Sequence, residues 1–385
     1  MCWVGSWVGS PAWWQVVGRQ AERQVAERQV AERQVAERQV AERQVEPPAE
    51  MPPAISVLLP VRDAAPYLPE CIASLRAQTF EDFEVLAVDD GSTDESPELL
   101  SAWAREDSRV SVVRQPPRGI VHALEAGRTS ARGRYLARMD ADDIAEPTRF
   151  AEQLALLEGR SDLAGCGTGV RYFPRAQVRG GGRRYEDWIN AIRTPEDVER
   201  NLFIECPLAH PTFFLRSGVV AEVGGYVDRG WPEDYDLLFR LWRSGARLAV
   251  VDRVLLQWRI RHDRTSVHHE AYTPEAFRRC KVHYLLDTLA RGRDGLVVWG
   301  AGPIGKAFAR EVQEQGGTVR AFVDLDPRKI DQCIHGAPVI HPSGIDQYRD
   351  GFSVAAVGQE GARRQICAEL ESAGWKEVAD FIAVA

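Results

Sequence analysis

Residues 133–143 read Gly-Arg-Tyr-Leu-Ala-Arg-Met-Asp-Ala-Asp-Asp, a short apolar run that ends in a group of carboxylates. The run from Tyr135 to Met139 predicts a buried strand, and Asp140-Ala-Asp142-Asp143 follows at its carboxyl end. Two of these carboxylates can reach one hard divalent cation from a tight turn, and Mg²⁺ or Mn²⁺ held in this way keeps open positions for phosphate oxygens. An Asp-rich helix cap before Pro147 explains the same residues without a metal, so the segment alone leaves both interpretations open.

Apolar runs and helical periodicity alternate on the amino-terminal side of this segment. Continuous apolar runs at 55–59, 85–88 and 110–113 predict further strands, and apolar residues over 68–75 recur at helical spacing. Such alternation of strands and helices predicts an α/β fold, with a mostly parallel sheet and helices on both of its faces.

Acidic residues also follow the first two predicted strands. Asp63 lies beyond the first strand, and Asp89-Asp90 comes directly after the second. The carboxyl ends of parallel strands meet at one sheet edge, where such sheets bind ligands, so we expect these side chains to lie near Asp140 and Asp142. One strand end often turns with Asp for structural reasons, but three acidic strand ends at one edge favour a binding site.

The composition is that of a globular protein and excludes several classes of function. The 385 residues, long enough for two domains, contain 48 Lys+Arg against 56 Asp+Glu. A net charge of −8 offers no basic field to phosphate polymers, so we expect no nucleic-acid partner. Seven cysteines without a Cys-x-x-Cys pair argue against a disulfide framework and a structural zinc, and favour the reducing cytoplasm.

The sequence predicts no transmembrane segment, because no apolar run approaches the ~18 residues that a spanning helix needs. Residues 1–18 carry four tryptophans, which leaves open a peripheral position at the inner face of a membrane. From Ala21 to Val45 the unit Ala-Glu-Arg-Gln-Val is repeated five times. A period of five advances each valine by about 140° around an α-helix, so no apolar stripe forms. We interpret residues 1–50 as a low-complexity leader, either disordered or a fluctuating helix.

Six motifs in order resemble the family 2 glycosyltransferases, which have the GT-A fold. They are Ile-Ser-Val-Leu-Leu-Pro-Val-Arg-Asp (55–63), Leu-Ala-Val-Asp-Asp-Gly-Ser-Thr-Asp (86–94), residues 133–143, His-Pro-Thr-Phe-Phe (210–214), Val-Gly-Gly-Tyr (223–226) and Glu-Asp-Tyr-Asp (233–236). The resemblance implies a GT-A catalytic domain over 51–270. It also implies transfer of a sugar from a nucleoside-diphosphate sugar to a hydroxyl of a glycan or lipid-linked acceptor. A UDP-sugar is the first candidate for the donor.

The resemblance also implies a donor site. Asp90 is expected to receive the base or ribose of the nucleotide-sugar, with Pro60, Asp63 and Arg118 beside it. Family members often have an aromatic-Asn pair where this chain has Arg62-Asp63, and this departure puts the donor preference in doubt. Arg62, Arg118 and Arg128 are candidates for phosphate contacts, and each of them is equally explained as a solvated surface residue.

Metal binding and catalysis follow from the same resemblance. Asp140 and Asp142 resemble the Asp-x-Asp that bridges Mg²⁺ or Mn²⁺ to the donor diphosphate, and Asp143 is a substitute ligand. Asp234 is the expected general base, which takes the proton from the acceptor hydroxyl so that the attack inverts the anomeric carbon. Two acids at 233–234 before a predicted helix are also stabilised by the helix dipole whatever their function.

Residues 295–385 carry a second strand-helix pattern, which a predicted helix in 271–294 connects to the first. Gly300-Ala-Gly302-Pro-Ile-Gly305 follows the apolar run 296–299, and Asp324 comes 24 residues after the first glycine, where a ribose partner is expected. The pattern predicts a small Rossmann-like domain with a second nucleotide site at Gly300, Gly302, Gly305 and Asp324. NAD(P) or another nucleotide is the candidate ligand, and a packing role without ligand explains the pattern equally well.

The sequence leaves two other functions open. One is a non-catalytic nucleotide-binding or regulatory protein, in which the altered Arg62-Asp63 motif leaves donor binding without transfer. The other is an NAD(P)-linked enzyme that depends on the C-terminal glycines. The glycine-rich stretch 180–184 is interpreted as a mobile lid or as plain disorder.

Overall fold

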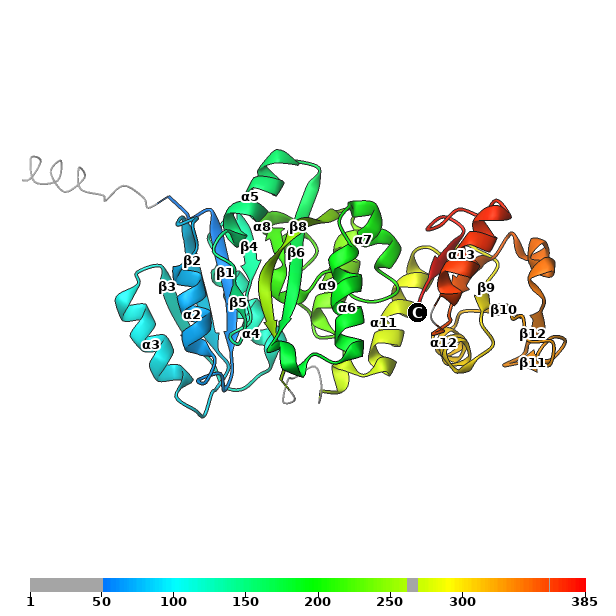
Figure 1. Ribbon diagram of the computed structural model, residues 1–385, viewed down its shortest axis with the longest axis horizontal. Helices are drawn as coiled ribbons and strands as arrows, with labels where there is room; N and C mark the ends of the chain where they lie inside the picture. Colours follow the sequence, from blue (N-terminus) through cyan, green and yellow to red (C-terminus); the bar gives the residue numbers. More distant parts are fainter. Residues whose placement is uncertain (1–50, 262–268, 360) are drawn as a thin grey trace, which may run out of the picture. The chain divides into compact units, whose positions relative to one another are not determined.

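The computed structural model describes residues 51–261, 269–359 and 361–385, so the predictions for 1–50 lie outside the described residues. From Pro53 onwards the chain forms one unit. Within the described ranges its strands build an eight-stranded and a six-stranded sheet (Figure 1). The predicted boundaries at 270 and 295 stay a prediction, because the two sheets belong to one unit.

The amino-terminal half of the large sheet alternates strands and helices. Its elements are β1 (Ile55–Val61), α2 (Leu68–Arg76), β2 (Phe83–Asp89), α3 (Ser96–Glu106), β3 (Val110–Arg114), α4 (Ile120–Ser130) and β4 (Tyr135–Arg138). The four strands are parallel, in the order β3-β2-β1-β4. α2 and α3 pack on one face and α4 packs on the other, which explains why β1 and β2 are apolar on both sides.

The second half of the sheet is mixed. Its elements are β5 (Ile144–Ala145), α5 (Arg149–Gly159), β6 (Leu163–Phe173), the 3₁₀ turn Arg175–Gln177, α6 (Gly180–Ala191), α7 (Pro195–Asn201), the 3₁₀ turn His210–Thr212, β7 (Phe214–Arg216), α8 (Ser217–Glu222), α9 (Glu233–Arg243) and β8 (Arg247–Arg259). The full order is β3-β2-β1-β4-β7-β6-β8-β5, with β6 and β8 parallel and β7 and β5 antiparallel to their neighbours. The predicted α/β class with a mostly parallel sheet is therefore confirmed.

Gly133 fixes the point at which the carboxylate-bearing segment enters the sheet. A Cβ added to it would lie 2.5 Å from the backbone nitrogen of Ser56, so no other residue fits without a shift. Its own N–H donates to Ser56 Oγ at 2.8 Å, and that hydroxyl donates to Glu84 Oε1 at 2.7 Å. These buried bonds lock the start of β4 against β1 and β2, and so set where Asp140 emerges.

The interpretation of residues 180–184 as plain disorder is wrong, because α6 begins at Gly180, and their interpretation as a mobile lid stays a prediction. The glycines occupy the first turn, where a helix needs few of its own hydrogen bonds. Contacts in the next turn of α6 stabilise the helix. Glu186 is buried there and accepts from Tyr172 N at 2.6 Å and from Arg175 Nη1 at 2.7 Å. These tertiary contacts outweigh the low helix propensity of the glycines.

The C-terminal sheet has the strand order of doubly wound nucleotide-binding folds. This part of the chain follows the 3₁₀ turn Glu270–Tyr272 and α11 (Pro274–Asp287). Its elements are β9 (Leu296–Trp299), α12 (Pro303–Glu314), β10 (Val319–Val323), β11 (Cys333–Ile334), β12 (Ala337–Ile340), the 3₁₀ segment Pro342–Tyr348, β13 (Phe352–Ala355), α13 (Ala362–Ser372) and β14 (Phe381–Ala383). The order is β11-β12-β10-β9-β13-β14, parallel except for the β11–β12 hairpin.

Lys281 of α11 joins the two sheet regions. Its Nζ donates to the carbonyl of Ile204 at 2.6 Å and to the carbonyl of Val384 at 3.2 Å. Burial lowers the pKa of this ammonium, and both carbonyl groups partly compensate for its lost hydration. A single side chain thus bonds the loop after α7 to the strand end after β14.

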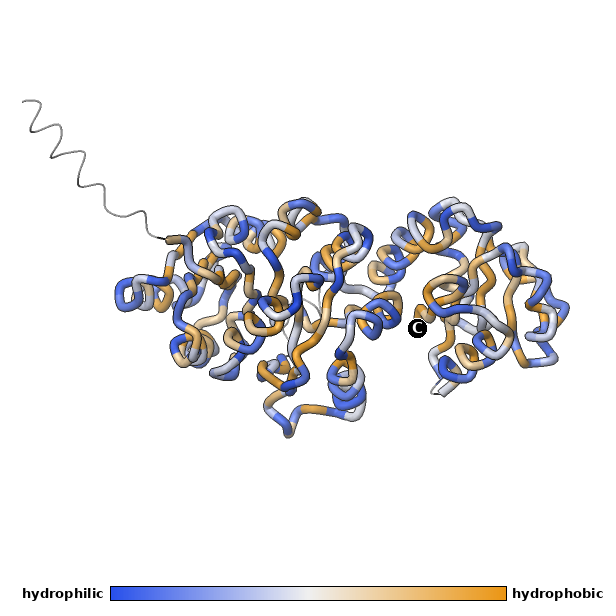
Figure 2. The backbone as a smooth tube through the Cα atoms, turned by 90° about the horizontal axis from the view of Figure 1, so that it is seen from above, coloured by the Kyte–Doolittle hydropathy of each residue, from blue (hydrophilic) through white to orange (hydrophobic). Residues whose placement is uncertain are grey.

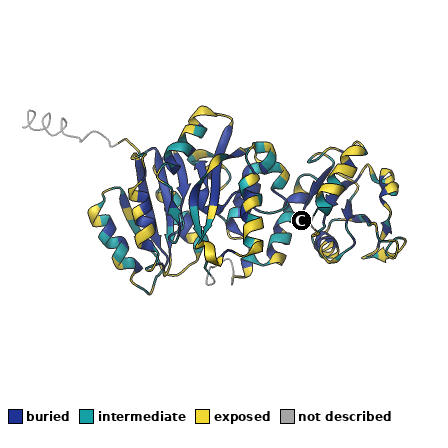
Figure 3. Ribbon diagram, viewed as in Figure 1, coloured by how far each residue is buried: buried dark blue, intermediate teal, exposed yellow. Residues whose placement is uncertain are grey.

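Apolar residues concentrate along the strands of both sheets, while the outward helix faces are polar (Figure 2). The same strands are buried and the exposed residues lie mainly on helices and loops (Figure 3). Among the described residues, no helix has both the length and the hydropathy that a bilayer crossing requires.

Candidate active site

A cavity of about 630 Å³ opens where β1, β2 and β4 end. Six of the predicted site residues line it: Pro60, Asp90, Arg118, Asp140, Asp142 and Asp234. Asp234 arrives from the first turn of α9, far away in sequence from the strand ends. The fold thus brings the predicted donor, metal and base residues to one cavity, as expected for the carboxyl edge of a parallel sheet.

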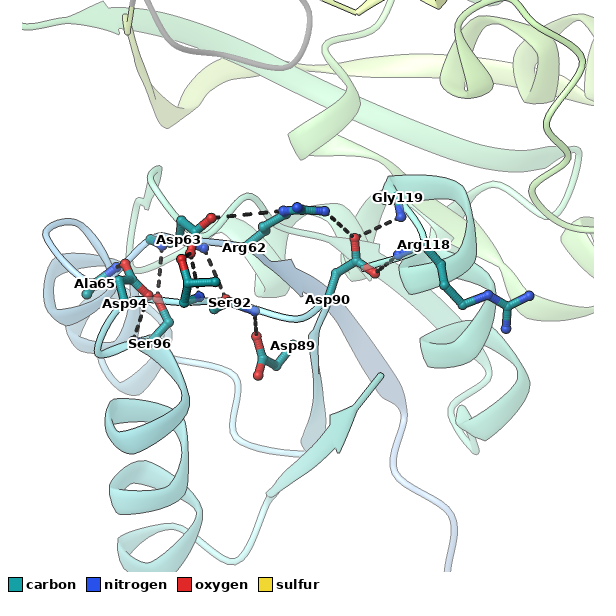
Figure 4. A network of polar contacts seen from close by, with 12 residues as sticks. Arg62, Asp63, Ala65, Asp89, Asp90, Ser92, Asp94, Ser96, Arg118 and Gly119 are labelled. Carbon is teal, nitrogen blue, oxygen red and sulfur yellow. Dashed lines mark hydrogen bonds and ion pairs between the residues drawn. The ribbon is translucent and has the colours of Figure 1, made fainter. Parts of the chain in front are cut away.

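Asp90 organises the wall of the cavity that leads into α4. Its buried carboxylate accepts the backbone N–H of Arg118 and that of Gly119, both at 2.8 Å (Figure 4). It also accepts Gln115 Nε2 at 2.7 Å. Arg62 Nη1 lies 3.5 Å from the same carboxylate. Gly119 has φ 91°, a conformation that a residue with a side chain rarely adopts, and it directly precedes α4. Asp90 therefore fixes the turn that carries Arg118 to the cavity.

Asp63 lies beside this wall and is not among the residues that line the cavity. It has φ 47°, and its carboxylate accepts Thr93 N at 2.7 Å and Thr93 Oγ1 at 3.2 Å. Its own N–H donates to Ser92 Oγ (Figure 4). The carboxylate therefore joins the loops after β1 and β2, and the expected contact of Asp63 with the donor stays a prediction.

Three carboxylates after β4 form a cluster with the chemistry of a hard-cation site. One oxygen each from Asp140, Asp142 and Asp143 can be chosen so that all three lie within 4.8 Å of one another. Carboxylate oxygens at this spacing suit Mg²⁺ or Mn²⁺. Asp143 is fully buried and accepts Arg259 N at 2.8 Å, whereas Asp140 and Asp142 face the cavity. The predicted division into two principal ligands and a substitute stays a prediction.

Cationic side chains surround these carboxylates. Arg138 Nη1 lies 2.5 Å from Asp140 Oδ1, and Arg261 Nη1 lies 3.5 Å from Asp142 Oδ2. Arg62 and Arg118 also line the cavity, whereas Arg128 does not, because its guanidinium bonds to Glu125 within α4. Of the three arginines considered for phosphate contacts, only Arg62 and Arg118 are therefore in reach of a ligand.

The start of α9 forms a buried acidic end of the cavity. Asp234 Oδ1 accepts the N–H of Tyr235 at 2.7 Å, and Cys206 Sγ lies 3.9 Å from its other oxygen. Burial, with the neighbouring charge of Glu233, raises the pKa of Asp234 to about 8. A carboxylate with such a pKa can accept a proton near neutral pH.

Glu233 is held by groups from two other segments. The hydroxyl of Tyr272 donates to Glu233 Oε2, and His210 Nδ1 lies 3.5 Å from Oε1. Burial raises the pKa of Glu233 and lowers the pKa of His210 well below its usual value, so the imidazole is neutral. This buried group fixes Glu233 beside Asp234, and Tyr272 and His210 both line the cavity.

Sequence reasoning missed Arg138, Tyr272 and Trp258, which all line the cavity. Arg138 had a local signal, since it is a charged residue inside an otherwise apolar strand and is only 2% exposed. Tyr272 and Trp258 had none, because their places depend on how distant segments meet.

Comparisons with known proteins find similar sequences and folds. Residues 56–224 match the family model "Glycosyl transferase family 2". An uncharacterized glycosyltransferase of Haemophilus influenzae is 27% identical over 246 residues, which are 62% of this chain and 76% of that protein. The O-antigen biosynthesis glycosyltransferase WbnJ of Escherichia coli is 28% identical over 224 residues, 57% of this chain and 84% of that protein. With three other curated relatives, the match spans only 34%, 33% and 31% of the length of the relative.

Among solved structures, S. aureus TarS in complex with UDP-GlcNAc is similar, with a TM-score of 0.51 and 17% identity. The match covers 60% of this chain and 66% of that one, and it supports the GT-A type of fold. The fold and the matches together define the protein as a glycosyltransferase. Residues 56–224 carry the similarity to family 2 of that class.

Proposed function

We propose that this protein is an inverting glycosyltransferase that moves a sugar from a UDP-sugar to a hydroxyl of a glycan or lipid-linked acceptor during polysaccharide biosynthesis. The observation that carries the proposal is the single cavity that Asp90, the carboxylates after β4 and Asp234 share. Names of relatives support the pathway class: besides WbnJ, the amylovoran biosynthesis glycosyltransferase AmsE of Erwinia amylovora is 29% identical over 200 residues. We extend the UDP-sugar class from TarS, which is in complex with UDP-GlcNAc.

The donor would lie between the strand ends of the sheet and α4. Arg62 and Arg118 would hold its phosphates or ribose, and the turn that Asp90 fixes would set the place of Arg118. Asp140 and Asp142 would hold Mg²⁺ or Mn²⁺, with Asp143 behind them, and the ion would supply positive charge to the diphosphate leaving group. Charge of this kind at the leaving group is what glycosyl transfer needs most.

Asp234 would be the base. The acceptor oxygen attacks the anomeric carbon from the face opposite the diphosphate, its proton passes to the Asp234 carboxylate, and the bond to the diphosphate breaks with its electron pair. One displacement of this kind inverts the configuration. The buried pair with Glu233, which Tyr272 and His210 hold in place, keeps the pKa of Asp234 high enough for this proton transfer.

Within residues 51–261, 269–359 and 361–385, no specific contact favours the other two functions. Asp324, the expected ribose partner, accepts the N–H of Ala301 at 2.9 Å and Lys329 Nζ at 2.8 Å. It therefore closes the glycine-rich loop on itself, as a packing role requires, and the second nucleotide site at Gly300, Gly302 and Gly305 stays a prediction.

The test measures UDP release and product configuration with the full chain. We expect UDP-sugar turnover with inversion, a loss of at least about a hundredfold in Asp234→Asn with UDP binding retained, and no change in the surface control Asp346→Asn. Retention of configuration would contradict the single displacement. NAD binding without any UDP or GDP binding would contradict the glycosyltransferase function as a whole.

A further inference from the structure

Two tyrosine hydroxyls, one from α11 and one from the turn before it, bond to the first turn of α9. The hydroxyl of Tyr272 donates to Glu233 Oε2. The hydroxyl of Tyr284 donates to Asp236 Oδ1 at 2.8 Å. Glu233 directly precedes the proposed base Asp234 in the sequence, and Asp236 follows it by two residues. One segment of the chain therefore bonds to the carboxylates on both sides of the base.

Asp236 is fully buried, so its carboxylate needs hydrogen-bond donors to replace the lost water. Besides Tyr284, Oδ1 accepts Trp231 Nε1 at 2.9 Å, and Oδ2 accepts Arg240 Nε at 2.7 Å. Arg229 Nε lies 3.5 Å from Oδ1. Asp236 does not line the active-site cavity, so it acts on the site only through the backbone of α9.

Helix geometry places Asp236 behind the base. Successive residues of an α-helix are rotated by about 100°, so side chains two positions apart point to nearly opposite sides. Asp234 lines the cavity, whereas Asp236 faces α11. The N–H of Asp236 donates to the carbonyl of Pro232 at 3.0 Å, so Asp236 belongs to the turn that carries Asp234. A shift of Asp236 would therefore shift the carboxylate of the base.

Packing holds Tyr284 in place. It is only 1% exposed, and its ring stacks on Phe239 of α9 with centroids 4.6 Å apart and an interplanar angle of 8°. His283, the preceding residue of α11, lies beside Trp231, with ring centroids 5.3 Å apart. α11 therefore contacts both α9 and the loop that precedes it, and it presents the Tyr284 hydroxyl in a fixed position.

We infer that Tyr284 is a positioning residue for the base, because it fixes the first turn of α9 through Asp236. Tyr272 holds the same turn through Glu233 from the cavity. The inference rests on the proposed function and adds to it a residue from outside 56–224, the range that matches the family model. α11 then completes the active site besides connecting two parts of the chain. Tyr284 does not line the cavity and takes no part in proton transfer.

The test compares Tyr284→Phe with Tyr135→Phe in the full chain. Phenylalanine keeps the ring that stacks on Phe239 and removes only the hydroxyl. Tyr135 is the matched control, because it is equally buried and its hydroxyl donates to Glu158 Oε1 at 2.9 Å, outside the cavity. We expect Tyr284→Phe to lower kcat about tenfold with the donor KM unchanged, whereas Tyr135→Phe leaves both unchanged. Both variants should lower the melting temperature slightly, since each loses one buried hydrogen bond.

A second measurement does not depend on turnover. Amide hydrogen exchange over 233–236 should be faster in Tyr284→Phe than in the wild type, while exchange over 118–121 in the donor wall stays the same. Trp231→Phe removes the other donor to Asp236 Oδ1 and should change kcat and exchange in the same direction.

Three outcomes overturn the inference: an unchanged kcat in Tyr284→Phe, a raised donor KM with kcat unchanged, and equal losses of kcat in Tyr284→Phe and Tyr135→Phe. In the first and third cases the hydroxyl only stabilises the fold, and in the second it acts on donor binding. If Tyr284→Phe fails to fold, Trp231→Phe decides by the same measurements. A wild type that releases no UDP from any donor disproves the proposed function, and exchange over 233–236 then still decides whether Tyr284 fixes this turn.

Discussion

Arg138 and Asp140 form an ion pair at the bottom of the cavity, with Arg138 Nη1 2.5 Å from Asp140 Oδ1. The guanidinium is only 2% exposed, and its charge also acts on Glu233 and Asp234. One buried cation therefore balances carboxylates at both the metal-binding end and the base end of the site. Because this charge is buried, its removal destabilises the protein more than removal of a surface arginine does.

Replacing Arg138 with methionine should destabilise the protein, because Asp140 and Glu233 lose their buried counter-charge. Asp140 is 30% exposed and can regain water, so we expect less than the about 3–5 kcal/mol of a fully buried broken pair. Urea unfolding measures the loss. Added Mn²⁺ should restore part of it, since the ion would neutralise Asp140 in place of the arginine. Arg134→Met, at a 66% exposed arginine of the same segment, is the control and should change little.

The rate of transfer should rise with pH up to the pKa of Asp234, which burial raises to about 8. The sign follows from the role of a base: the reactive form is the carboxylate, and a raised pKa shifts its appearance to higher pH. Below that pKa we expect kcat/KM to increase up to about tenfold per pH unit. UDP binding measured over the same range is the control and should be flat. A profile independent of pH between about 5.5 and 8.5 would contradict the role of Asp234.

Asp142 and Asp143 should respond differently to alanine. Asp142 lines the cavity, so Asp142→Ala should abolish the Mn²⁺-dependent part of UDP binding and leave the melting temperature within about 2 °C. Asp143 is fully buried and accepts the Arg259 N–H, so Asp143→Ala should lower the melting temperature by several times that amount. Calorimetric titration with and without Mn²⁺, together with thermal unfolding, separates the two effects. Equal losses of stability in both variants would count against this division of tasks.

Asp90→Asn should weaken UDP binding through the turn before α4. A carboxylate can accept the N–H groups of both Arg118 and Gly119, whereas an amide has a single acceptor oxygen and directs its NH₂ at one of these donors. We expect about a tenfold loss of UDP affinity and faster hydrogen exchange over 118–121. Asp346→Asn is the control. Unchanged exchange with lost affinity would mean that Asp90 contacts the nucleotide directly.

The strand ends of the first sheet half were predictable because their signals are local. Continuous apolar runs followed by Asp90 and Asp140 define both the strands and their carboxyl edge, and the structure brings these residues together. Asp63 was harder, because a positive φ turns it towards Thr93, and no sequence pattern specifies that turn for an aspartate.

The remaining features depend on distant contacts. Residues 180–184 have the composition of a loop, yet the buried Glu186 on the next turn makes them helical. Trp258 meets Tyr172 only through the parallel register of β6 and β8, and Tyr272 reaches Glu233 from a segment beyond the large sheet. Pairings of this kind are set by tertiary packing, which periodicity and motif spacing do not encode.

Lys281 gives the chain one further property. Because its ammonium bonds the carbonyls of both Ile204 and Val384, neither segment can open without leaving a buried charge short of a partner. The two segments should therefore exchange their amide hydrogens as one cooperative unit, although they are far apart in sequence. Cys206, which lies beside Asp234, follows Ile204 by two residues. We therefore expect faster amide exchange around Cys206 when Lys281 is replaced, because its bond to Ile204 is then lost.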